Sequence, residues 1–301
     1  MMFGTFALRP VWIVSAFAAS PLFADCNDLE SRMKAMAERG DADGSIRLFS
    51  QGETDPGCSS GSLASLGRWT AYAHLSAARS PRVDTETAEQ LLDQALQYGR
   101  PWQVTASLAE IKLAKKDYSS AVHLFQEAID DIEVASVAEA PSIEVIRKIF
   151  ADATIARSLA PDYIVATRAR GEVGGLGRLS IRGHGVRRRA IPVRFTYNSA
   201  ELEDFGIEAA EDMLTTLERQ GSPNITLIGH TDPQGPDAYN LSLSLKRAEA
   251  VRDFLIKRGY LGDVQTDGRG EQVTVALDDP DLYSIDEIHQ LRRRVELVID
   301  N

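Results

Sequence analysis

Cysteine is scarce in this sequence of 301 residues, which contains only Cys26 and Cys58. Neither has another Cys or a His at the short spacing of a zinc site, which disfavours a metal role for the pair. In a chain that leaves the reducing cytoplasm, two cysteines are most simply a disulfide. Such a bond would tie residue 26 to the loop around Pro56 and, by loop entropy, stabilise the fold by about 3–4 kcal/mol.

Positive charge is also in short supply. The chain has 33 Lys and Arg against 44 Asp and Glu, a formal net charge of -11. Nucleic-acid binding requires Lys and Arg that displace counterions from phosphates, so this balance argues against such a partner. The exception is the stretch 168–189, which holds seven Arg and one Glu. It predicts either a solvated linker or an electrostatic contact with the acidic C-terminal part or with an anionic surface.

The sequence has no long apolar run. Its most apolar stretch near the start, Val11–Ser20, is too short to span a bilayer. Because Arg9 precedes this stretch, we interpret residues 1–24 as a secretory signal peptide, which leaves Asp25 as the first mature residue. A lipid anchor on Cys26 is disfavoured because Asp25 occupies the position where lipidation signals have a small residue. An uncleaved anchor is disfavoured because the run buries too little surface.

Residues 25–160 are rich in Ala, Leu and Glu, a composition that favours helices. This region also repeats itself at an offset of 33 residues. Seven positions recur: Trp69, Ala73, Leu75, Asp84, Ala88, Leu92 and Ala95 are matched by Trp102, Ala106, Leu108, Asp117, Ala121, Phe125 and Ala128. Each unit predicts two helices joined by a short turn. The small residues let the helices approach closely, and the large ones fill the groove between units.

The second unit is similar to a tetratricopeptide repeat in the segment 116–121 (Lys-Asp-Tyr-Ser-Ser-Ala), followed by Phe125 and Ala128. We expect a degenerate earlier unit at 42–49 and a closing helix at 142–159 that covers the last exposed face. The resemblance implies a concave surface for a peptide or protein partner. The alternative is that the repeats serve only as a packed spacer.

Residues 161–189 are interpreted as a basic, β-rich connector. Pro161 ends the helical region, and short strands are expected at 163–167 and 179–181 around a glycine-rich turn. A dinucleotide-binding loop is disfavoured, because the glycines are followed neither by a helical pattern nor by an acidic residue at the required distance.

From residue 190 to residue 301, predicted strands and helices alternate. Strands are expected at 191–195, 225–228, 264–269 and 294–299, and amphipathic helices at 205–217 and 240–258. This order predicts an α/β sandwich with helices on one face of a mixed sheet. The acidic segment 277–288 is expected to be a solvated loop with a short helix.

The stretch 225–247 places opposite charges on two sides of a turn. A buried strand ends at Gly229, Asp232 follows it, and Arg247 lies on the next helix after a loop rich in Pro and Gly. Arg presents a planar fork to a carboxylate, and Asp accepts hydrogen bonds from an ammonium. The pair therefore suits a ligand that carries both groups. The structural alternative is that Asp232 caps its own loop and Arg247 pairs with a surface acid such as Asp237.

Four separated motifs in this region resemble the OmpA-like peptidoglycan-binding domain. They are FTYNSAEL at 195–202, GHTD at 229–232, NLS from 240 with Arg247-Ala248, and RRVE at 293–296. The resemblance covers residues 191–301, about the last third of the chain. It implies non-covalent binding of the peptide stem of peptidoglycan, typically at meso-diaminopimelate.

The same resemblance assigns roles to individual residues. Asp232 would meet the ligand's ammonium and Arg247 its carboxylate, with Asn198, Thr231 and Asn240 lining the pocket.

The chain departs from the family pattern at two places. Pro233 and Gln234 stand where a further acidic or polar residue is common, and Arg292 stands where Asn usually precedes the Arg pair. These departures bear on loop shape and ligand preference. Arg293 and Arg294 are expected to support the fold or to pair with acidic neighbours.

Catalysis and metal binding find little support in the sequence. His230 and Asp232 lie too close along the strand to face each other across a substrate, and no Gly-x-Ser-x-Gly elbow is present. His184, His230 and His289 belong to different predicted elements and lack the spacing of zinc ligands.

We therefore predict an exported, multidomain protein without cofactors: a signal peptide (1–24), a tetratricopeptide-like helical domain (25–160), the connector (161–189) and an OmpA-like domain (190–301). In this hypothesis the last domain anchors the protein non-covalently to the cell wall in the periplasm of a diderm bacterium, near the outer membrane. The helical domain recruits a protein partner. The competing hypotheses are a wall-targeted enzyme and a purely structural envelope spacer.

Overall fold

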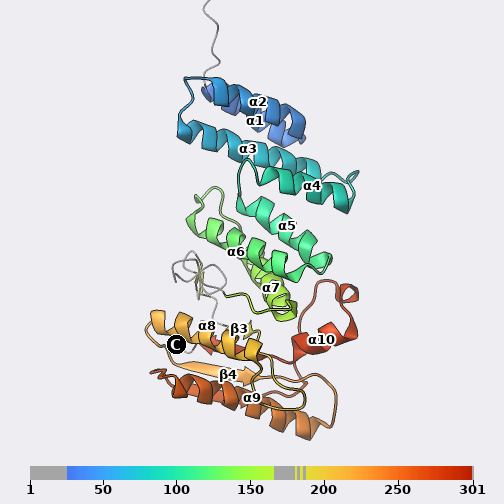
Figure 1. Cartoon of the computed structure of the whole chain (residues 1–301), viewed down its shortest axis with the longest axis vertical. Coiled ribbons are helices and arrows are strands. Elements are labelled where there is room, and N and C mark those ends of the chain that lie inside the picture. Colours follow the sequence, from blue (N-terminus) through green and yellow to red (C-terminus); the bar gives the residue numbers. More distant parts are fainter. Residues whose placement is uncertain (1–25, 166–179, 182–183, 186–187, 300–301) are drawn as a thin grey trace, which may run out of the picture.

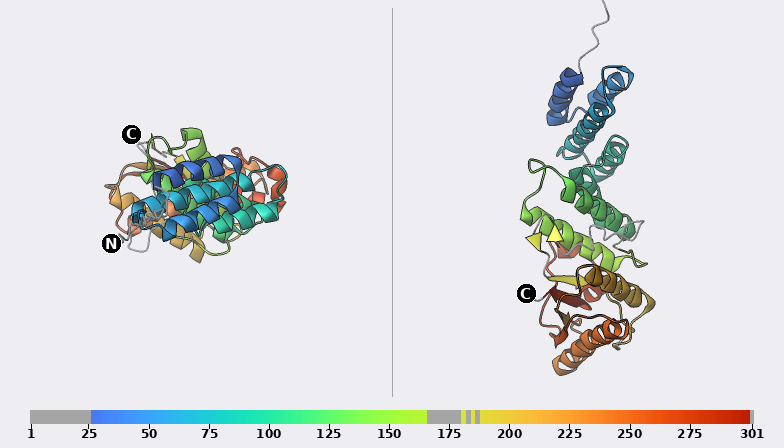
Figure 2. Two further views of the ribbon diagram at one scale, coloured as in Figure 1. Left: turned by 90° about the horizontal axis from the view of Figure 1, so that it is seen from above. Right: turned by 90° about the vertical axis from the view of Figure 1, so that its left-hand side faces the viewer.

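The computed structural model describes residues 26–165, 180–181, 184–185 and 188–299. It is elongated, with a stack of helices along the long axis and an α/β region at the far end (Figures 1 and 2). The predicted signal peptide and most of the predicted connector lie outside the described residues. No helix in the described ranges is both long and apolar enough to cross a bilayer.

Seven helices form the stack among the described residues. They are α1 (Cys26–Arg39), α2 (Ala42–Thr54), α3 (Ser60–Ala78), α4 (Thr85–Ala95), α5 (Trp102–Ala114), α6 (Tyr118–Val134) and α7 (Ile143–Leu159). The predicted repeat of helical hairpins is confirmed, and its local chemistry repeats as well. Asp84 and Asp117, 33 residues apart, are the N-caps of α4 and α6, and each accepts a hydrogen bond from a backbone N–H three residues on.

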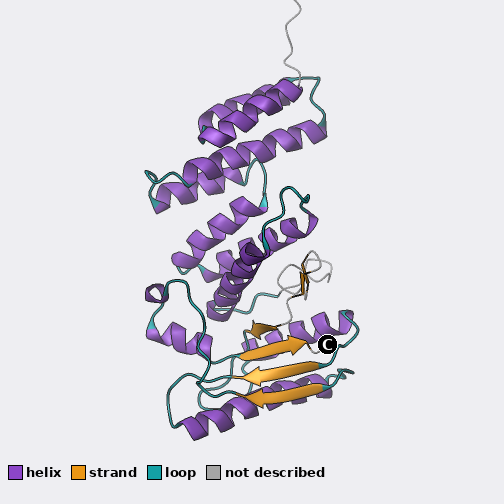
Figure 3. Ribbon diagram, turned by 180° about the vertical axis from the view of Figure 1, so that it is seen from behind, coloured by secondary structure: helices purple, strands orange, loops and turns teal. Residues whose placement is uncertain are grey.

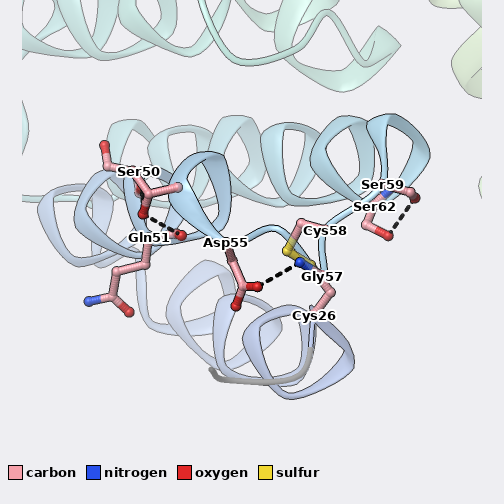
Figure 4. The surroundings of a disulfide bond; sticks show 9 residues. Cys26, Ser50, Gln51, Asp55, Gly57, Cys58, Ser59 and Ser62 are labelled. Atoms are coloured by element: carbon pink, nitrogen blue, oxygen red, sulfur yellow. Dashed lines mark hydrogen bonds between the residues drawn. A yellow bond between two sulfur atoms is a disulfide. The ribbon is translucent and has the colours of Figure 1, made fainter. Parts of the chain in front are cut away.

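The predicted disulfide joins Cys26 and Cys58, and it links the start of α1 to the turn before α3 (Figure 4). Both cysteines pack against a small apolar cluster made by α1, α2 and α3, whose buried members include Leu29, Met33 and Leu66. The bond thus ties together the end of the stack that, among the described residues, is not covered by a further helix.

The C-terminal region is a four-stranded mixed sheet with two long helices on one face, as predicted (Figure 3). Its elements are β3 (Arg188–Ile191), α8 (Asp204–Arg219), β4 (Ile225–Gly229), α9 (Asp237–Lys257), β5 (Val264–Gly268), a 3-10 turn η2 (Pro280–Leu282), α10 (Ile285–Arg292) and β6 (Val295–Ile299). The strand order is β3-β6-β4-β5, in which β4 and β5 are parallel and β6 is antiparallel to both its neighbours. A two-residue pair, β1 (Ser180–Ile181) and β2 (His184–Gly185), stands apart from this sheet.

The first strand of the sheet differs from the prediction. It runs over Arg188–Ile191, where Ile191–Phe195 was expected, so the sheet begins inside the predicted connector. Phe195 makes only an isolated bridge with Leu202. The shift has a physical reason: Arg188 pairs with Glu296 of β6, a contact between residues distant in sequence.

Glycine permits α9 to lie unusually close to the sheet. A Cβ on Gly229, at the end of β4, would stand 1.9 Å from the carbonyl oxygen of Ser244 on α9, and one on Gly268 would stand 2.7 Å from Leu245 N. Only residues without a side chain fit such an approach. The contact holds the end of β4 against the helix that carries Arg247.

The segment 277–288 is a mostly exposed loop with a short helix, as expected, and it also contacts the helical stack. Leu291 of α10 is buried in the core of the stack, and Val275, Leu277 and Tyr283 pack against it. The C-terminal region therefore covers part of the outer face of the closing helix α7.

Polar contacts also join α7 to the C-terminal region. Arg157 donates to Asp212 of α8 at 3.0 Å, and Tyr163 donates to the same carboxylate oxygen at 2.6 Å. The guanidinium of Arg194 donates to the carbonyls of Ser158 and Ala160, which are left free where α7 ends. A cation at a helix C-terminus also opposes the negative end of the helix dipole.

Glu287 connects α10 to the repeats. It accepts from Lys116 Nζ at 2.7 Å and from Tyr118 OH at 2.5 Å, and it closes a capping box with Ser284. Burial alone would raise the pKa of Glu287, but the hydrogen bonds from Lys116, Tyr118 and Ser284 outweigh it and lower the pKa to about 2.

A prediction for the pH dependence of stability follows. The folded-state pKa of Glu287 lies below its unfolded value, so its contribution is complete above pH ~4.5 and is lost as the pH falls towards 2. Glu287→Gln should abolish about 2–3 kcal/mol of the stability difference between pH 6 and pH 2.5, measured by urea unfolding. Asp286→Asn, at an exposed neighbouring position, is the control and should leave that difference unchanged. Equal pH profiles for all three proteins would contradict the assignment.

Candidate functional site

Asp232 lies just beyond the end of β4 and is 8% exposed. The chain beyond the strand is fixed by backbone hydrogen bonds, since His230 N donates to Arg294 O and Thr231 N donates to Gly270 O, each at 2.9 Å. Asp232 Oδ1 accepts from Gln234 N at 3.0 Å, so one oxygen caps the following turn, as the structural alternative foresaw. The other oxygen, Oδ2, is bound by Arg293.

Arg247 projects from α9 and is 2% exposed, which is more enclosed than most arginines in proteins. Its guanidinium lies 5.0 Å from the centre of the Phe195 ring, and its Nε donates to Ser199 O at 3.1 Å. Burial lowers the pKa of Arg247 to about 10, and the positive charge of Arg293 acts in the same direction while Asp232 opposes it. The side chain therefore remains a cation at neutral pH, in a place where a cation is costly.

Arg293 bonds to one of the two predicted ligand groups, Asp232, and lines the same cavity as the other, Arg247, whereas Asp232 is not among the residues that line this cavity. Its Nη1 donates to Asp232 Oδ2 at 2.6 Å, and its charge is felt at Arg247. The prediction that Arg293 pairs with an acidic neighbour is confirmed, and the neighbour is the site carboxylate itself. Sequence reasoning missed this because Arg293 is separated from Asp232 by 61 residues. Arg294, by contrast, pairs with Glu296 at 2.7 Å.

The three supporting residues lie around this cluster. Asn240, 2% exposed, donates to the backbone oxygen of Asp232 at 3.4 Å and to Glu271. Asn198 is at the exposed rim in a left-handed conformation (φ 55°), and its side-chain oxygen accepts from Tyr239 OH at 2.7 Å. Thr231 is buried, and its hydroxyl has no hydrogen-bond partner among the described residues.

A cavity of about 270 Å³ opens beside Arg247 and Arg293. Arg194, Arg294 and Glu203 also line it, so basic side chains outnumber acidic ones four to one. A polar cavity of this size, with a buried unpaired cation in its wall, is suited to an anionic group of a ligand.

The helical stack supplies part of the same cavity. Ser158, near the end of α7, and Gln290, on α10, both line it, and Gln290 donates to Ser158 O at 2.6 Å. The predicted OmpA-like motifs contain neither residue. Their role could not be found from the sequence, because it depends on how the stack packs against the sheet.

His230 is buried inside the domain, whereas a catalytic base must reach the substrate. It is 0% exposed, and its Nε2 lies 3.5 Å from Glu296 Oε1 in the interior of the sheet. A substrate at the cavity would not reach a fully buried imidazole. Among the described residues, no group of three or more His, Cys, Asp or Glu is arranged to hold a metal ion.

Comparison with known proteins identifies the region that carries this cluster. Residues 194–282 match the OmpA family. The C-terminal third of the chain contains an OmpA-family domain. The match includes Asp232 and Arg247 and ends before α10 and Arg293, which complete the cluster described above.

Curated relatives match about a quarter to a third of this chain. "Outer membrane protein A" of Atlantibacter hermannii is 40% identical over 84 residues, which are 26% of this chain and 34% of that protein. "Peptidoglycan-associated lipoprotein" of Rhizobium meliloti is 36% identical over 96 residues, 28% of this chain and 54% of that protein. The chain thus spans about a third to a half of the length of these relatives.

Solved structures resemble the same part of the chain. The peptidoglycan-associated lipoprotein from Burkholderia pseudomallei is 29% identical, covering 38% of this chain and 90% of that one, with a TM-score of 0.31. A structure titled as the cell wall anchor of the T6SS from Pseudomonas aeruginosa is 27% identical, covering 36% and 75%, with a TM-score of 0.29.

The unpaired hydroxyl of Thr231 leads to a prediction about stability. Thr231→Val removes a buried hydroxyl that bonds to nothing in the described protein, so the free energy of unfolding should stay within about 0.5 kcal/mol of wild type or rise. Ser244→Ala is the matched comparison, because Ser244 Oγ accepts from Gly270 N at 2.9 Å. It should cost about 1–2 kcal/mol. Urea unfolding of both variants measures the two free-energy changes. If Thr231→Val loses as much stability as Ser244→Ala, the hydroxyl of Thr231 has an internal hydrogen-bond partner and the prediction is wrong.

Proposed function

We propose that the OmpA-family domain binds the stem peptide of peptidoglycan at meso-diaminopimelate, with the ammonium of its free end at Asp232 and the adjacent carboxylate at Arg247. The observation that supports this most is the state of Arg247. It is a buried cation on the wall of a cavity, and from Nε it reaches only a neutral carbonyl, Ser199 O, among the described residues. A buried charge to which no carboxylate is hydrogen-bonded is costly, so the site gains by taking up a carboxylate.

The energetics support a reversible anchor. Each charge-assisted hydrogen bond is worth roughly 1.5–3 kcal/mol net, so two of them give a single site of weak to moderate affinity. Peptidoglycan offers many identical stem peptides, so several copies of the protein held together would be retained by avidity. We propose binding without catalysis, since His230 is fully buried and cannot act as a general base on a ligand in the cavity.

Peptidoglycan as ligand implies an exported protein, in the periplasm and in contact with the cell wall. The disulfide between Cys26 and Cys58 supports this placement, because structural disulfides persist in oxidising compartments. The names of the relatives, which mention the outer membrane and peptidoglycan, support an envelope location.

We also propose that the helical repeats hold a protein partner. Support comes from a groove of about 410 Å³ between α3, α4 and α5, with Leu75, Leu92 and Ile111 among its walls. Val134, the last residue of α6, is 78% exposed, and Val137, in the loop that follows, is 88% exposed. The spacer hypothesis remains the alternative, and it draws support from the covered face of α7.

Sedimentation with purified peptidoglycan sacculi tests the wall-binding proposal. Asp232→Ala and Arg247→Ala should each reduce the co-sedimenting fraction, with an apparent affinity lower by about tenfold or more, because each removes one charged contact. The controls are Asp237→Ala, which removes an exposed acid, and Lys246→Ala, which removes an exposed base. Both residues lie on α9, and both variants should bind as wild type does. Free diaminopimelate should compete. If both site variants sediment as fully as wild type, the proposed site is wrong.

A further inference from the structure

The charges around the site do not balance for a simple zwitterion. Asp232 supplies one carboxylate, while Arg247 and Arg293 supply two guanidinium groups. Arg293 is 36% exposed at its side chain, whereas Arg247 is enclosed. With a ligand end that carries one ammonium and one carboxylate, the cluster would keep a net positive charge in a partly buried place.

The other side chains of the cavity do not supply the missing negative charge. Arg294 is already neutralised by Glu296, through two hydrogen bonds of 3.0 and 2.7 Å. Arg194 adds a further cation, because its guanidinium is bonded to neutral carbonyls at the end of α7. Glu203 is the one acidic residue that lines the cavity. Its negative charge offsets the positive charge of Arg194. The excess positive charge of the cluster formed by Asp232, Arg247 and Arg293 is therefore not compensated.

We propose that the cavity accepts a second carboxylate, and that the preferred ligand is therefore a stem peptide that ends at diaminopimelate. This inference rests on the proposed function and specifies its ligand. The free end of diaminopimelate provides one ammonium and one carboxylate. When diaminopimelate is also the last residue of the peptide, the chain end adds the second carboxylate. The ligand end then carries a net charge of minus one, which matches the cluster.

Arg293 is the specificity-determining residue in this arrangement. In the described structure its Nη1 occupies Asp232 Oδ2, the oxygen that a ligand ammonium would need. When the ammonium takes this oxygen, the guanidinium of Arg293 is released and donates to the second carboxylate. A peptide that continues past diaminopimelate presents an amide at that position. An amide brings no negative charge, so the released cation would lose the chain-end carboxylate and have only the α-carboxylate of the γ-linked D-glutamate, which both kinds of peptide carry.

The position of Arg293 favours such an exchange. It follows α10 directly, and α10 is held on the helical stack through Glu287 and Gln290. Its backbone is thus anchored, since Arg293 N donates to His289 O at 3.1 Å, while its side chain lies at the mouth of the cavity. The guanidinium can turn from one carboxylate to another without moving the helix.

The test compares two synthetic peptides, L-alanyl-γ-D-glutamyl-meso-diaminopimelate with its chain-end carboxylate free and the same peptide with that carboxylate as a carboxamide. Calorimetric titration of the full-length protein should show about tenfold tighter binding of the free acid. Arg293→Gln should reduce this ratio to about one, and it should bind the carboxamide at least as tightly as wild type, because Asp232 is then free for the ammonium. Lys246→Gln removes an exposed charge beside Arg247 and should keep the ratio of wild type.

The outcomes separate this inference from the proposed function. Equal binding of acid and carboxamide by wild type, with both abolished by Arg247→Gln, would overturn the second-carboxylate inference and leave the proposed site intact. Failure of either peptide to bind wild type, together with unimpaired sedimentation of Asp232→Ala, would overturn the proposed function. If Arg293→Gln weakens both peptides equally while its thermal unfolding matches wild type, Arg293 supports the site without selecting the chain end, and the inference is wrong.

Discussion

The close approach of α9 to the end of β4 is the constraint on which the site depends. Gly229 lets the backbone of Ser244 come within van der Waals range of the strand, and this sets how far Arg247, one turn further along α9, lies from the chain that leaves β4. A side chain at Gly229 would push the helix outward. In the proposed function, the carboxylate of Asp232 and the guanidinium of Arg247 would then be too far apart to hold one small ligand. The opposition of charges is thus a consequence of backbone packing.

The second constraint comes from the helical stack. The OmpA-family domain does not stand alone, because α10 and the chain before it share a core with α7, and α10 leads straight into Arg293. Arg194 and Gln290 bond to the carbonyls where α7 ends, beside the cavity that Ser158 also lines. The repeats and the cavity proposed to bind the wall are therefore parts of one packed unit. A partner on the repeats would be held at a fixed position relative to the cell wall.

The features that could be predicted from the sequence are those that depend on residues close together along the chain. The 33-residue repeat was visible at seven matched positions, among them Asp84 and Asp117, which cap the second helix of each unit, and capping depends on only a few neighbouring residues. Alternating apolar residues and the motif spacing predicted the order of strands and helices along the C-terminal third of the chain. The position of Asp232 after a buried strand, and of Arg247 on the following helix, also followed from spacing.

What could not be predicted depends on contacts between distant residues. The first strand was misplaced because the pairing of Arg188 with Glu296 links residues 108 apart. The acidic segment 277–288 was expected in solvent, where most of its residues lie, but the hydrogen bond that joins its Glu287 to Tyr118, 169 residues away, could not be predicted. For the same reason Arg293 could be assigned to an ion pair, while its partner and its place in the cavity became clear only in the folded chain.

The central claim is that Arg247 receives the carboxylate at the free end of diaminopimelate. The most direct measurement is a calorimetric titration of the full-length protein with two stem peptides that differ only in having diaminopimelate or lysine at the third position. Lysine keeps the ammonium and lacks the carboxylate, so we predict binding that is weaker by about tenfold or more for the lysine peptide. Equal affinities for the two peptides would contradict the account.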